Sequence, residues 1–140
     1  MPNIASNATR PPLLVARAST ALLVLLAVAQ AALAGDFLGG RYDALLMHAL
    51  GARALTLGSA AQVVVLAWLW RAGGPRAPFF AGVVQTLLLV AEFATGELHF
   101  AVVQVPLGVL LVAGIVQLTA LVWRTPLPSR LAVDDVAVSS

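Results

Sequence analysis

The two histidines of this chain are the residues whose positions could carry chemistry. His48 and His99 each stand near the start of a long apolar run, Ala44–Trp70 and Leu98–Trp123. The second and fourth helices of an up-down bundle enter a membrane from the same side, so both imidazoles are expected at one depth. Neutral imidazole is a natural axial ligand of haem iron, and helical bundles build cofactor sites from residues on facing helices. We therefore predict that His48 and His99 hold one b-type haem.

A second interpretation of the same histidines is purely structural. Each ring could lie among lipid headgroups at the membrane edge, solvated and without a ligand. The spacing of the sequence does not separate the two interpretations. Arg53 follows His48 on the same apolar run and is a candidate partner for a haem propionate. Small residues near the histidines would leave room for a porphyrin: Ala49, Gly51, Ala52 and Ala101.

Composition indicates the elements that must position these residues. The chain of 140 residues is 61% hydrophobic and 10% charged, whereas soluble domains carry roughly 25% charged residues. A bilayer core about 30 Å thick takes about 20 helical residues to cross. We predict an all-α fold, an integral membrane antiparallel four-helix bundle. The expected helices cover residues 18–38, 44–70, 79–96 and 98–123, between an N-terminal tail (1–17) and a C-terminal tail (125–140).

The arginines predict the orientation of this bundle. Six of them fall on one side of the four spans, and the other side carries Arg41 with three carboxylates. Arginine excess marks the cytoplasmic side, so both tails are expected in the cytoplasm. All eight basic residues are arginine, which indicates a GC-rich bacterial genome, so the bundle is expected in a bacterial inner membrane. A different possibility is that the first apolar run is a signal peptide with a cleavage site at Ala32-Leu33-Ala34.

Further polar residues lie inside the apolar runs. Arg53 and Glu92 are charged, and intramembrane charges usually face the bundle interior or a partner. They could pair structurally, with Arg53 alternatively reaching outward to the headgroups, or serve a proton path. The amides are expected to face one another and to hold the helices together by hydrogen bonds: Gln30, Gln62, Gln85, Gln104 and Gln117.

Several classes of function are excluded by composition. The chain has no cysteine, which excludes disulfides, thiolate metal sites, iron–sulfur clusters and covalently attached haem. Its glycine pairs lack the spacing of phosphate-binding loops. It has no clustered basic face with interleaved aromatic residues, so no nucleic-acid partner is expected.

One pattern resembles a known family. Gln30, Gly35 and His48, followed by Glu92 and His99, resemble half of a bacterial haem A synthase over about Ala21 to Trp123. The resemblance implies a four-helix bundle in which the histidines of the second and fourth helix ligate haem. In that family an acidic residue directly precedes the first histidine, whereas here Asp43 stands five residues earlier. The chain also resembles small four-helix membrane proteins of actinobacteria, which implies no activity.

Three functions follow from these residues. The first is non-covalent haem b binding for electron transfer with a membrane redox partner. With both axial positions of the iron filled, no enzymatic reaction is expected there. The second is a cofactor-free membrane subunit or assembly factor of a larger complex. The third is a small carrier that uses Arg53 and Glu92, although the chain lacks the paired broken helices typical of transporters.

Overall fold

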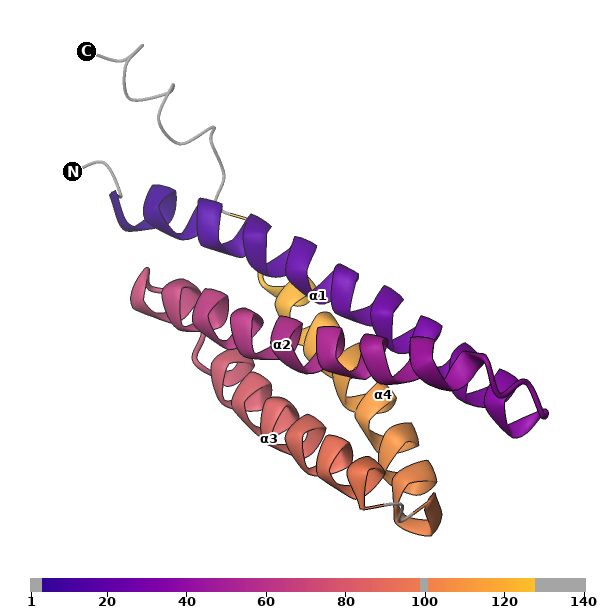
Figure 1. Ribbon diagram of the computed structural model, residues 1–140. Helices are drawn as coiled ribbons and strands as arrows, with labels where there is room; N and C mark the ends of the chain where they lie inside the picture. Colours follow the sequence, from indigo (N-terminus) through magenta and orange to yellow (C-terminus); the bar gives the residue numbers. More distant parts are fainter. Residues whose placement is uncertain (1–3, 99–100, 128–140) are drawn as a thin grey trace, which may run out of the picture.

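The described part of the chain forms four α-helices, whose arrangement is shown in Figure 1. The computed structural model describes residues 4–98 and 101–127. Its helices are α1 (Ile4–Leu38), α2 (Ala44–Arg71), α3 (Ala77–Glu97) and α4 (Ala101–Arg124). All four are long and apolar enough to cross a membrane. The predicted all-α fold with four candidate membrane spans is therefore confirmed.

The helices form an antiparallel bundle in which neighbours in the chain are neighbours in space. α1 packs against α2 and α4, and α3 packs against the same two helices. Within the described residues, the diagonal pairs α1 with α3 and α2 with α4 have no Cα atoms within 8 Å. The end of the bundle at which α1 and α3 finish is called the hairpin end. The opposite end, at which α2 and α4 finish, is called the arginine end. Helix α2, which carries His48, and helix α4, which begins after His99, are thus diagonal to one another and not in contact.

The first helix begins much earlier than the sequence predicted, at Ile4 rather than at Ala18. It continues through Pro11 and Pro12, although proline inside a helix removes a backbone donor. Tertiary packing compensates for this local cost, because Pro12, Leu13 and Ala16 are buried. In addition, the Thr9 hydroxyl donates to the carbonyl oxygen of Ala72 at 2.9 Å. The segment predicted as a tail is in part a helix that packs on the end of α2.

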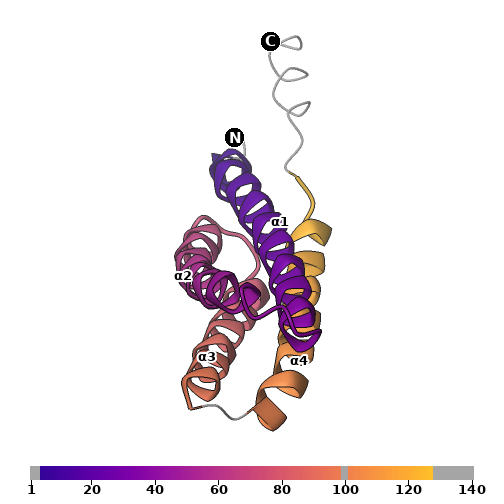
Figure 2. The ribbon, with the colours of Figure 1, turned by 45° about the vertical axis from the view of Figure 1, so that its right-hand side comes forward.

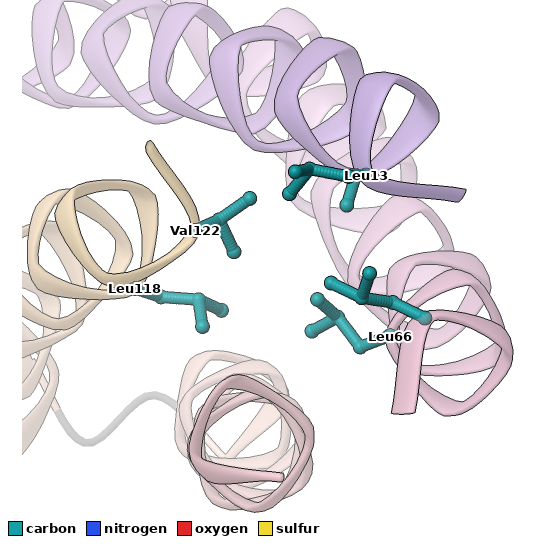
Figure 3. Packing of buried hydrophobic residues seen from close by; sticks show 6 residues of the cluster. Leu13, Leu66, Leu118 and Val122 are labelled. Carbon is teal, nitrogen blue, oxygen red and sulfur yellow. The ribbon is translucent and has the colours of Figure 1, made fainter. Parts of the chain in front are cut away.

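The core consists of two apolar clusters. The first lies toward the arginine end and joins α1, α2 and α4, with Leu13, Leu66, Leu118 and Val122 pointing toward one another (Figure 3). The second lies nearer the middle and takes residues from all four helices: Leu23, Ala27, Leu55, Leu89, Leu111 and Ile115. Between this second cluster and the hairpin end, Ala44 is the only buried residue that the structure describes. Core packing therefore stops about two-thirds of the way along the bundle.

The hairpin end is also where the helix pairs separate. In Figures 1 and 2 the connection between α1 and α2 lies apart from the neighbouring ends of α3 and α4. Apart from Ala44, the inward-facing residues of the third of the bundle next to the hairpin end are half-buried, among them Phe93, Leu107 and Gly108. The bundle is consequently tight at the arginine end and looser at the hairpin end.

Arg17 joins α1 to the end of α4. Its guanidinium donates to the carbonyl oxygens of Trp123 (3.1 Å) and Thr125 (2.7 Å). The same group lies 5.5 Å from the centroid of the Trp123 ring, whose indole nitrogen donates to the Thr20 hydroxyl at 3.3 Å. A cation at a helix C-terminus is favoured by the helix dipole. Arg17 therefore holds the first and last helices of the chain, α1 and α4, together.

Replacing Arg17 by glutamine is expected to destabilise the bundle by about 1.5–3 kcal/mol, the usual value for hydrogen bonds that involve a charged group. Thermal unfolding in detergent, followed by circular dichroism, measures this change. Arg124→Gln is the matched control, because Arg124 is exposed at the same end. Equal stability of the two variants would contradict the role given to Arg17.

Candidate functional site

His48 lies one turn into α2 and is half-buried. Its Nδ1 atom is buried and has no hydrogen-bond partner. A buried ring nitrogen without a partner is unfavourable, because it loses its bond to water and gains none in return. The position is therefore suited to a bound ligand or a metal ion at the imidazole.

His99, the second predicted ligand, lies outside the described residues, as does Phe100. That the two imidazoles lie at one depth and face each other thus stays a prediction. Helix α4 begins just after it, at Ala101.

Near the hairpin end, the amide side chain of Gln30 on α1 lies close to the His48 position on α2. Gly51, one turn further along α2, faces the side chain of Gln30 on α1, and a Cβ atom at Gly51 would collide with the Gln30 Nε2 atom. The Oε1 atom of Gln30 is buried and unpartnered. A second unsatisfied polar atom thus lies about one helical turn from the His48 position.

The α3–α4 side repeats this arrangement with Glu92 and Gln104. A Cβ atom at Gly108 would lie 3.4 Å from Glu92 Oε1, and one at Gly96 would lie 2.9 Å from Gln104 Nε2. The Oε2 atom of Glu92 is buried without a partner. Each polar side chain therefore rests over a glycine of the neighbouring helix, as the small-residue packing of membrane helices allows.

A polar layer crosses the middle of the bundle. Gln62 and Gln85 are buried, with exposed fractions of 2% and 6%. The Gln85 amide donates to the carbonyl oxygen of Leu111 at 3.1 Å, and the hydroxyls of Ser59 and Thr86 are 2.7 Å apart. The Nε2 atom of Gln62 has no partner. This layer bonds α3 to both of its neighbours.

Gln117 does not face the interior, contrary to the prediction. Its side chain is exposed. The inward stripe of α4 is apolar, with Leu111, Ile115 and Leu118 buried. These residues recur at the three- and four-residue spacing of one helix face, so packing of leucine and isoleucine decided the rotation of α4.

Arg53 also points away from the interior. It is exposed on α2 together with Leu50 and Leu57, which are 48% and 71% exposed. At about 100° per residue, Arg53 points roughly 140° away from His48 around the helix. This direction does not suit a partner for the propionate of a haem bound at His48. Arg53 and Glu92 form no ion pair. Within the described ranges the ion pair is Arg41 with Asp36, at 3.2 Å.

Two interactions escaped the sequence analysis. In the sequence Arg17 looks like an ordinary arginine that flanks a helix. Its hydrogen bonds to carbonyl groups at the end of α4 are evident only from the packing of the helices. The Ser59–Thr86 pair follows from the register between α2 and α3, for which the sequence carries no signal.

The described part of the site contains too few ligands for a multidentate metal centre. Among residues 4–98 and 101–127 no group of three or more His, Cys, Asp or Glu side chains could hold a metal ion. A haem iron needs only two axial ligands from the protein, and one of the two candidates lies outside those ranges.

No protein-family model matches this sequence, and neither a curated protein nor a solved structure shows significant similarity to it.

Proposed function

We propose that this chain is a multi-pass protein of a bacterial cytoplasmic membrane that binds one b-type haem through His48 and His99. The arginine end faces the cytoplasm in this proposal, and both termini lie there. Arg71, Arg76 and Arg124 are exposed at that end, whereas Asp43 and Glu97 are exposed at the other. This asymmetry follows the positive-inside rule.

The observation that carries the proposal is the unpartnered, buried Nδ1 atom of His48. It occurs on the inward side of α2, in the third of the bundle where apolar packing has ended. An imidazole binds metal through either ring nitrogen, so haem iron bound at the Nδ1 atom of His48 would replace the missing hydrogen bond.

The neighbouring residues fit such a group. Gly51 and Ala52 are half-buried and small, and Phe93 and Leu107 offer apolar surface from the opposite helix pair. When bound, a haem with two histidine ligands supplies one-electron transfer. His48 would supply one ligand, and the surrounding apolar side chains would exclude water. We infer a role in electron transfer to or from a membrane redox partner.

The test is the absorption spectrum of protein purified in mild detergent from haem-replete cells. The wild type is expected to show a Soret band and, after reduction, a sharp α-band. His48→Ala and His99→Ala should each lose at least about ten-fold in haem content, by analogy with the 10–100-fold effects seen even for residues that support a metal ligand. Gln117→Ala is the control, because Gln117 is exposed. A colourless wild type, or histidine variants with unchanged haem, would refute the proposal.

A cofactor-free subunit or assembly factor is the second candidate, and Arg53 is the observation that favours it. Its side chain is exposed in an apolar row of α2, where a carboxylate of a partner protein would compensate the charge. In this case the wild type would be colourless and would co-purify as a larger complex that Arg53→Leu dissociates. A coloured monomer would argue against it.

A further inference from the structure

The connection between α2 and α3 carries an exposed aromatic cluster. The ring centroids of Trp70 and Phe79 are 5.2 Å apart, those of Trp70 and Phe80 are 5.7 Å apart, and those of Phe79 and Phe80 are 5.2 Å apart. Trp70 and Phe80 remain 41% and 53% exposed. Three rings thus form one apolar surface at the arginine end of the bundle.

Two arginines flank these rings. Arg71 is the last residue of α2, and Arg76 precedes the first residue of α3. Both are exposed, and neither forms an ion pair with a carboxylate of residues 4–98 or 101–127. Those carboxylates lie toward the hairpin end: Asp36, Asp43, Glu92 and Glu97. We call Trp70, Arg71, Arg76, Phe79 and Phe80 the turn patch.

We propose that the turn patch binds the headgroup of an anionic phospholipid. The indole ring of Trp70 favours the boundary between hydrocarbon and headgroups, which sets the height of the patch in the bilayer. At that height Arg71 and Arg76 meet lipid phosphates, and a guanidinium group binds phosphate through two parallel hydrogen bonds. The excess positive charge selects anionic over zwitterionic lipid.

The position of the tryptophans makes this proposal measurable. All three tryptophans of the chain lie near the arginine end, as Trp68 and Trp70 on α2 and Trp123 on α4. Their fluorescence therefore reports on lipid at this end alone. The full-length protein is reconstituted into vesicles of phosphatidylcholine and phosphatidylglycerol, with the acyl chains of one or the other lipid brominated as quencher.

We expect brominated phosphatidylglycerol to quench the wild type more strongly than brominated phosphatidylcholine. A basic residue near an anionic surface contributes about a five-fold preference, so Arg71→Gln/Arg76→Gln should reduce the preference at least about five-fold. Arg41→Gln is the matched control, because Arg41 lies at the hairpin end and is paired with Asp36. Its preference should equal that of the wild type.

A salt series guards against misfolding of the double variant. The wild-type preference should fall as salt rises, because screening weakens the attraction of exposed charges. Equal quenching by both lipids at low salt would overturn the proposal, as would an unchanged preference in the folded double variant. Neither outcome depends on whether the protein binds haem.

Discussion

Gly114→Val is expected to destabilise the bundle by about 3 kcal/mol, combining overpacking with the loss of a buried hydrogen bond. A Cβ atom at Gly114 would overlap the Oε1 atom of Gln85. The Gln85 side chain is 6% exposed and donates to the carbonyl oxygen of Leu111. The Gln85 side chain would have to shift to avoid this overlap, and the hydrogen bond between α3 and α4 would be lost.

Titration of the folded protein with SDS in mixed micelles, followed by circular dichroism, measures this change in unfolding free energy. Gly35→Val is the matched control, because a Cβ atom at Gly35 meets nothing within 4 Å. Its effect should stay below about 1 kcal/mol, since valine and glycine differ little in helix propensity. Similar losses in both variants would mean that the contact between Gly114 and Gln85 contributes nothing specific.

His48→Gly should produce the largest functional effect, a loss of bound haem of at least about ten-fold, because loss of a residue that only supports a metal ligand already costs about 10–100-fold. The substitution removes the imidazole and leaves a space of its size on the inward side of α2. Free imidazole added to the variant should enter this space and restore the Soret band. A rescue of this kind separates ligation from a general loss of folding.

The control for this rescue is Arg53→Gly, which also places a glycine in α2 but at an exposed position. Its haem content should match the wild type with and without imidazole. A His48→Gly variant that keeps its haem, or one that folds and does not respond to imidazole, would exclude His48 as a ligand.

The number and approximate extent of the helices were predictable because each apolar run is long enough to cross a bilayer. The start of α1 was not, since Pro11 and Pro12 suggest a break and only burial of Leu13 and Ala16 on the neighbouring helices explains a helix there. Local propensity was outweighed by a tertiary contact that the sequence does not display.

The orientation of the polar residues was predictable only in part. On α2 and α3 the polar stripe coincides with small or apolar inward residues, so Gln62 and Gln85 are buried as expected. On α4 the direction rested on Gln117, whereas Leu111 and Leu118 make up the buried side. One amide is a weaker guide to helix rotation than a periodic row of large apolar side chains.

The contacts between a polar side chain and a glycine on the next helix could not be predicted at all. Gln30 over Gly51 and Glu92 over Gly108 depend on the relative height of two helices. A single sequence contains no information on that register. The separation of the helix pairs at the hairpin end depends on it as well.

The most direct test of the haem proposal is a titration of the purified, haem-free protein with haemin, followed by absorption spectroscopy. We predict a Soret band that grows linearly and stops at one haem per chain, with the spectrum of a low-spin iron held by two imidazoles. A band that keeps rising without saturation, or that saturates equally in the double variant His48→Ala/His99→Ala, would contradict it.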